Sequence, residues 1–218
     1  MKSYVITIEH LQESRSAAAR CKKSMPEYNV QNFYGCTPKD NPAYQLKHNG
    51  MSPDGFAQST GKEYSFEESA MAAFMSHWSL WKRCAEGNEE FQIFEHDAVC
   101  IAPIPEFIPY KYCISLGQPS YGSYRSEATL GVNPLFSKPY FPGAHAYRLK
   151  PKGAKLLIEK AKECAEPTDI FLRLENFPWL QEYFPWPVMA DDSFTTIQRE
   201  LGCKAKHNYI EEEFDIIQ

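Results

Sequence analysis

Two acidic side chains and an imidazole interrupt an apolar run in the segment FQIFEHDAVC, residues 91–100. Residues 91–94 have the apolar character of a buried strand, and Glu95, His96 and Asp97 follow them directly. An unpaired carboxylate in a dry interior costs several kcal/mol of free energy. We therefore expect the strand to end at this point, so that the acids face a cleft or a positively charged group.

The spacing of the two acids suggests a metal site. Along an extended chain the side chains alternate between faces, so Glu95 and Asp97 are expected on one face and His96 on the other. Such a carboxylate pair suits Mg²⁺ or Mn²⁺ bound to a diphosphate, because these cations favour carboxylate oxygen and complete their shell with phosphate and water. The same two acids could instead cap a neighbouring helix or pair with a surface lysine or arginine.

The elements that must position these residues alternate between strand and helix. The patterns predict strands over residues 4–8, 29–34, 91–94, 111–116 and 144–149, and helices over residues 9–23, 65–87 and 151–164. This alternation predicts an α/β domain with a mostly parallel central sheet and helices on both faces. In such sheets ligands bind beyond the carboxyl ends of the strands, where Glu95 and Asp97 fall.

The segments between these elements are expected to be irregular. Residues 36–64 and 118–142 are rich in turn-forming residues and predict long loops, and the acidic tail over 211–218 is expected to fray. The helix over 65–87 has the clearest ends, because Ser65 and Glu68 have capping-box spacing and Gly87 can end it.

Length and charge limit the classes of function. A chain of 218 residues predicts one domain over 1–218, and its net charge of −5 argues against a protein that coats nucleic acid. The seven cysteines form no CxxC pair, which favours reduced, buried thiols and a cytoplasmic protein. We find no signal peptide and no apolar run long enough to span a membrane.

Several segments resemble glycosyltransferase family 25, the lipopolysaccharide and collagen galactosyltransferase group. The Leu-Glu-Asp-Asp-Ala type motif of that family is similar to residues 94–98, Phe-Glu-His-Asp-Ala. The other similarities are Ile6-Thr7-Ile8 with Arg15, Ser76-His77 with Leu80-Trp81, Gly143-Ala144-His145-Ala146-Tyr147, Lys152-Gly153-Ala154 with Leu156-Leu157, and Asp169 with Phe171-Leu172. The chain departs from the family at His96, which replaces an acid, and at Ala72-Ala73, which replace Gly-Cys.

This resemblance implies a GT-A fold, which is a Rossmann-like nucleotide-diphospho-sugar transferase domain. It implies a UDP-sugar as donor, with galactose or glucose as the sugar, and a Mn²⁺ or Mg²⁺ ion held by Asp97 and Glu95. Glu95 would also reach the ribose or the donor sugar. Thr7, Arg15 and His145 would line the nucleotide-sugar site, although Arg15 could equally be a solvated helix residue.

The family looks inverting, which implies a single displacement and a base that takes the proton of the acceptor hydroxyl. Asp169 is the candidate base, and the pair Asp191-Asp192 is its rival. Either could instead cap a helix or a turn. His77 lies on the apolar face of its helix, where a histidine is more often a core residue than a ligand.

The acceptor and the activity itself stay open. Aromatic residues of the 118–142 loop could stack on a glycan, a protein side chain or a modified nucleobase. One alternative is therefore a glycosyltransferase that acts on a hydroxylated DNA base. Another is a catalytically inactive relative that binds nucleotide or glycan, which the replacement at His96 would suit.

Overall fold

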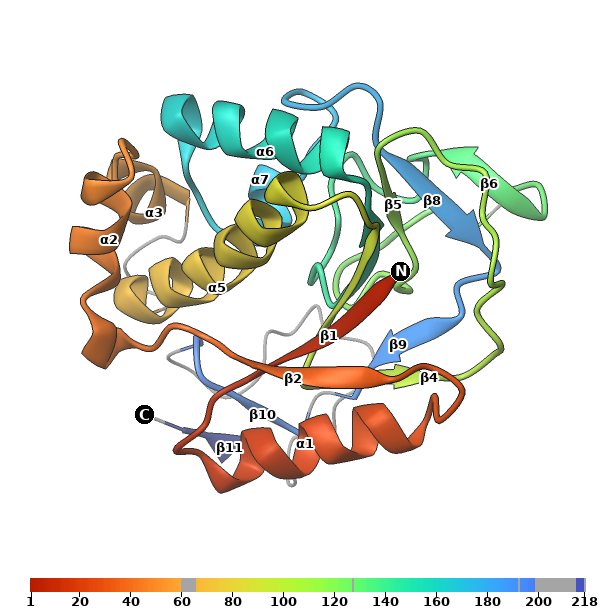
Figure 1. The fold of residues 1–218 in the computed structure, drawn as a ribbon, viewed down its shortest axis with the longest axis horizontal. Helices are drawn as coiled ribbons and strands as arrows, with labels where there is room; N and C mark the ends of the chain where they lie inside the picture. The colour runs from red at the N-terminus through yellow and green to blue at the C-terminus, as the bar shows by residue number, and fades with distance from the viewer. Residues whose placement is uncertain (60–65, 127, 192, 199–214, 218) are drawn as a thin grey trace.

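A seven-stranded sheet forms the centre of the computed structural model, which describes residues 1–59, 66–126, 128–191, 193–198 and 215–217 (Figure 1). In spatial order its strands are β2 (Val30–Tyr34), β1 (Lys2–Thr7), β3 (Phe91–Glu95), β7 (Ala146–Leu149), β5 (Cys113–Ser115), β8 (Gln181–Phe184) and β6 (Gly131–Pro134). Two short strand pairs accompany the sheet: β4 (Ala98–Cys100) with β9 (Val188–Ala190), and β10 (Phe194–Thr195) with β11 (Asp215–Ile216). The predicted α/β class is confirmed.

The prediction of a mostly parallel sheet is wrong, because the sheet is mixed. β1 is parallel to β2 and β3, and β5 is parallel to β8, whereas β7 is antiparallel to β3 and β5, and β6 is antiparallel to β8. A parallel return needs a crossover, usually a helix, that carries the chain back to the other end of the sheet. The described residues between β5 and β7 form no helix, so β7 starts from the edge at which β5 ends.

Helices cover both faces of the sheet, as expected (Figure 1). On one face lie α5 (Glu67–Glu86), α6 (Pro151–Cys164) and the short α7 (Thr168–Phe171), and on the other lies α1 (Gln12–Lys23). The alternation along β1 shows the two layers: Ile6 belongs to the core under α5, and Val5 to the core under α1.

The helix ends follow local sequence signals. Gly87 ends α5, as predicted, and its N–H donates to Cys84 O at 3.2 Å. The predicted cap Ser65 lies outside the described residues, and Phe66 precedes the first turn.

The predicted long loops contain regular elements. The segment over 36–64 includes a 3₁₀ turn, η1 (Pro38–Asp40), and the helices α2 (Pro42–His48) and α3 (Asp54–Ser59). The start signal of α2 is local: Asn41 Oδ1 accepts the N–H of Tyr44, and Pro42 occupies the first turn. β6 lies within 118–142, and β11 lies within the expected frayed tail, of which only residues 215–217 are described.

Two further expectations from the sequence concern the state of the cysteines and the membrane-spanning capacity of the helices. The six cysteines of the described residues are free thiols: Cys21, Cys84 and Cys113 are buried, and Cys36, Cys100 and Cys164 are half-buried. Cys203 lies outside the described residues. In the part of the chain that the structure describes, every helix is too short or too polar to cross a bilayer.

Glu182 on β8 holds the loop that leads out of β6. Its side chain is 1% exposed, and its carboxylate accepts hydrogen bonds from the backbone N–H groups of Phe136 and Ser137 and from Trp186 Nε1. A buried carboxylate with three donors is well satisfied, so this acid has a structural role.

We predict that Glu182→Ala lowers the free energy of unfolding by about 3 kcal/mol, because each buried donor left without an acceptor costs about 1–3 kcal/mol. Denaturant unfolding measures the change. The control is Glu175→Ala, whose side chain is 82% exposed and pairs with Arg173 at 3.3 Å. A similar loss in both variants would contradict the structural role of Glu182.

Candidate active site at the carboxyl edge of the sheet

Four strands of the sheet have an end at one edge. β1, β3 and β5 end there at Thr7, Glu95 and Ser115, and the antiparallel β7 begins there. The N–H of Glu95 donates to His145 O at 2.9 Å, which joins the end of β3 to the residue before β7. The predicted placement of Glu95 at the carboxyl end of a strand is therefore correct.

Glu95 belongs to a chain of hydrogen-bonded side chains between α5 and the sheet. Its Oε1 lies 2.9 Å from His77 Nε2, and His77 Nδ1 lies 2.8 Å from the hydroxyl of Tyr147. The same hydroxyl accepts the indole N–H of Trp81 at 2.8 Å. We refer to Trp81, Tyr147, His77 and Glu95 as the α5 relay.

The imidazole of this relay is neutral. His77 is 1% exposed, and burial lowers its pKa from 6.5 to about 3, against a smaller opposing effect of the negative charge of Asp169. The sequence-based view of His77 as a core residue holds. Its partners are the side chains of Tyr147 and Glu95.

Asp169 lies close enough to His77 for its charge to act on the imidazole. It is in the first turn of α7, where its Oδ1 accepts the N–H of Ile170 at 2.9 Å and its Oδ2 accepts the hydroxyl of Tyr121. Burial raises the pKa of Asp169 above its usual value, although the Tyr121 hydrogen bond lowers it. A carboxyl group with a raised pKa is suited to exchange protons near neutral pH.

Asp97 has different surroundings from Glu95. β3 ends at Glu95, and residues 96–97 form a turn, so the alternation that would place the two acids on one face stops before Asp97. Glu95 contacts His77 of α5, whereas the charge of Asp97 acts on Cys21 of α1, where it adds to burial in raising the thiol pKa to about 12. The expectation that Glu95 and Asp97 share one face is therefore wrong, because the extended strand on which it depends ends at Glu95.

His96 points away from Glu95 and the α5 relay, as predicted, but it contacts α1, the helix on whose Cys21 the charge of Asp97 acts, so it is not opposite both acids. Its Nδ1 lies 3.1 Å from Ser14 Oγ on α1, and its ring stacks on Phe194 with centroids 5.0 Å apart. Ser14 Oγ also accepts the N–H of Ile8 at 2.8 Å. His96 thus ties the turn after β3 to α1.

Thr7, Arg15 and His145, which are predicted to line the nucleotide-sugar site, differ in burial and in hydrogen-bond partners. Thr7 is fully buried, and its hydroxyl donates to Val5 O at 3.2 Å. Arg15 is exposed and donates to Glu9 O and to Gln12 Oε1, which favours its local role on the helix surface. His145 is 2% exposed at the carboxyl edge, beside the left-handed backbone of Gly143 and Ala144.

The rival base Asp191 is engaged elsewhere. Its Oδ2 pairs with Arg20 Nη1 at 3.1 Å, and its N–H donates to Asp97 O at 2.8 Å. Asp192 lies outside the described residues.

The residues fit a divalent cation through Asp97. Its Oδ1 is buried and has no hydrogen-bond partner among the described residues. A carboxylate oxygen of this kind is a suitable ligand for Mn²⁺ or Mg²⁺. No group of three His, Cys, Asp or Glu side chains gathers within the described ranges, so phosphate and water would have to complete the shell.

Sequence reasoning missed three contributors to this site. Tyr147 ends the family-like motif over residues 143–147, which assigns it no role of its own, yet its hydroxyl bridges His77 and Trp81. Tyr121 holds Asp169, and Ser76 Oγ accepts the N–H of Cys36 at 2.9 Å just after β2. The spacing of Ser76, His77 and Trp81 on one helix was visible, but their partners are distant in the chain.

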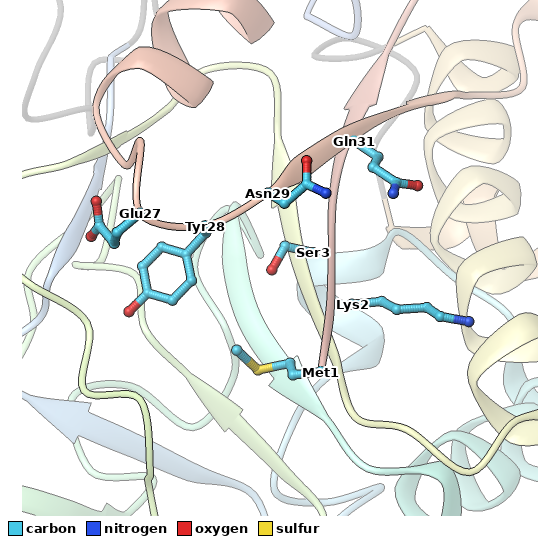
Figure 2. Close-up of a pocket in the computed structure, with 7 residues that line it drawn as sticks. All are labelled: Met1, Lys2, Ser3, Glu27, Tyr28, Asn29 and Gln31. Carbon is cyan, nitrogen blue, oxygen red and sulfur yellow. The ribbon is translucent and has the colours of Figure 1, made fainter.

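A hollow of about 290 Å³ lies at the opposite edge of the sheet, beside the amino ends of β1 and β2 (Figure 2). Its lining residues are Met1, Lys2, Ser3, Glu27, Tyr28, Asn29 and Gln31. None of these is a predicted site residue, and the parallel strands separate the hollow from Glu95 by the length of β3.

We predict that Gly117→Ala disturbs the site through His145. A methyl group at Gly117 would lie 2.4 Å from His145 Nε2, so the buried ring must move, at a cost of about 1–3 kcal/mol in unfolding free energy. Thermal unfolding tests this against Gly87→Ala, where the nearest atom is Arg83 O at 3.4 Å. Equal melting temperatures for the two variants would argue against the close packing of His145 on Gly117.

Comparison with known proteins adds one finding. The family model described as glycosyltransferase family 25 (LPS biosynthesis protein) matches residues 1–108, and no curated protein matches the chain. The matched residues run from β1 to beyond β4 and include His77, Glu95 and Asp97, but neither Tyr147 nor Asp169. Residues 1–108, just under half of the 218-residue chain, are therefore similar to glycosyltransferase family 25.

Proposed function

We propose that this chain is a GT-A glycosyltransferase that moves a hexose, galactose or glucose, from a UDP-sugar to an acceptor hydroxyl. The observation that carries the proposal is the convergence of family-like residues from three distant segments. His77 of α5 contacts Glu95 at the end of β3, and the charge of Asp169 of α7 acts on His77. Glu95 lies at the carboxyl edge of the sheet, the edge at which α/β proteins bind nucleotides.

Asp97 would hold the divalent cation, whereas Glu95, which contacts α5 while Asp97 acts on α1, is assigned to the donor. When bound, Mn²⁺ or Mg²⁺ would offset the charge of the diphosphate leaving group. The buried Oδ1 of Asp97, which has no hydrogen-bond partner among the described residues, supports this assignment. Glu95 would accept a hydrogen bond from a hydroxyl group of the ribose or the donor sugar.

Asp169 is the proposed base of an inverting displacement. It takes the proton of the acceptor hydroxyl while the acceptor oxygen forms a bond to the anomeric carbon and the bond from that carbon to the diphosphate breaks. The raised pKa of Asp169 and its hydrogen bond from Tyr121 support a carboxyl group held in place for proton transfer. The acceptor is a glycan, a protein side chain or a modified nucleobase.

The first prediction from the proposed function concerns the donor. Incubation with UDP-, GDP- and CMP-sugars and Mn²⁺ should release UDP from one UDP-hexose, and Asp97→Asn should lower that rate about 100-fold through the loss of cation binding. The control is Asp54→Asn, which makes the same change at an exposed position. Release that is equal in Asp97→Asn and native protein would remove Asp97 from the site.

A second prediction concerns the metal. Chelation with EDTA should abolish release of the nucleotide, and added Mn²⁺ or Mg²⁺ should restore it, because the ion offsets the charge of the diphosphate. Release that persists in EDTA would contradict metal assistance. Binding of UDP, measured as a rise in melting temperature, without release from any donor and acceptor tested would indicate an inactive relative.

A third prediction separates the two candidate bases. Asp169→Asn should lower transfer by about 10²–10⁴-fold, the usual contribution of a general base. Asp191→Asn should change it by less than about tenfold, since it removes only a partly exposed ion pair with Arg20. The reverse order of the two effects would make Asp191 the base.

A further inference from the structure

We propose that Trp81, Tyr147 and His77 are positioning residues that hold Glu95 in one orientation as a hydrogen-bond acceptor. Only the claim that Glu95 binds the donor rests on the proposed function. The relay itself is argued from donors and acceptors. It assigns Tyr147 and Trp81, which touch no ligand in this scheme, a part in ligand recognition.

Trp81 fixes the direction of hydrogen-bond donation along the α5 relay. An indole nitrogen can only donate, so the Tyr147 oxygen accepts at this contact of 2.8 Å. Both side chains are fully buried, so water cannot substitute for either partner. The single hydrogen of the Tyr147 hydroxyl is then available for one further contact.

That contact is with His77. If the Tyr147 hydroxyl donates to His77 Nδ1, at 2.8 Å, every group is satisfied and the imidazole carries its hydrogen on Nε2. If Nδ1 carried the hydrogen instead, the Tyr147 oxygen would accept twice. Its own hydrogen would then have no acceptor among the hydrogen bonds of the described residues, which costs about 1–3 kcal/mol in a buried site.

The same choice determines what Glu95 does. With its hydrogen on Nε2, His77 donates to Glu95 Oε1 at 2.9 Å, so Glu95 is an acceptor at this contact. Glu95 is the last residue of β3, and its side chain is 28% exposed, so one part of it is reachable from outside. A glutamate at such a position loses side-chain freedom when it binds a ligand, and a relay anchored in the core removes that freedom beforehand.

The test is Tyr147→Phe, which removes one hydroxyl and keeps the ring. Long-range ¹⁵N NMR of the histidine side chains should show His77 with its hydrogen on Nε2 in the native protein and a mixture of tautomers in the variant. The variant should also lower kcat/KM for the donor about tenfold, mainly through KM, because Glu95 is less well oriented. The control is Tyr110→Phe, which removes another buried hydroxyl, bonded to Glu90 at 3.1 Å on the other face of the sheet.

The outcomes separate the relay from the proposed function. A hydrogen on His77 Nδ1 in the native protein, or a single unchanged tautomer in Tyr147→Phe, would overturn the relay. A shifted tautomer with unchanged KM would overturn the claim that the relay orients Glu95 for a ligand. If the native protein transfers no sugar, the proposed function fails. The tautomers of His77 still test the hydrogen-bond directions in the relay. Binding of UDP to Tyr147→Phe, compared with the native protein, still tests whether the relay orients Glu95 for a ligand.

Discussion

The arrangement of the site depends on a polar layer that is shut off from water between a helix and a sheet. Apolar contacts alone would allow α5 to slide or rotate on the strands, because dispersion contacts have little directional preference. His77 and Trp81 add contacts with fixed direction, since each must meet the hydroxyl of Tyr147 at hydrogen-bond distance. The helix, β7 and the end of β3 therefore have one mutual placement in which the hydrogen bonds of the α5 relay can all form.

The antiparallel course of β7 is the second requirement. Because β7 starts at the edge at which β3 ends, His145 lies beside Glu95, and Tyr147 lies opposite Ile93, two residues before Glu95. A parallel β7 would bring its opposite end to this edge and leave His77 without Tyr147. The departure from a parallel sheet thus assembles a site from segments about fifty residues apart in the chain.

Local patterns predicted much of the architecture and less of the site. The strands over 91–94 and 144–149 and the helices over 65–87 and 151–164 follow from periodicity, and Glu95 could be placed at a strand end. The direction of β7 could not be predicted, because strand patterns are the same in both directions. The shared face of Glu95 and Asp97 failed because the turn at residues 96–97 needs the pairing of β4 with β9, which no local pattern reveals. Tyr147 was missed because its partners are on another element.

The pairing of β4 with β9 has a consequence for the order in which the molecule assembles. Residues 98–100 join residues 188–190, and the carbonyl of Asp97 accepts the N–H of Asp191. The ribosome adds about 5–20 residues per second, so the turn that carries Asp97 waits several seconds for its partner strand. The amino-terminal half alone holds residues 94–98 and the neighbouring β1, but it lacks β7 and β9, the partners of β3 and β4. A nascent chain would therefore gain the turn that carries Asp97 only late in synthesis, after most of the sheet has been made.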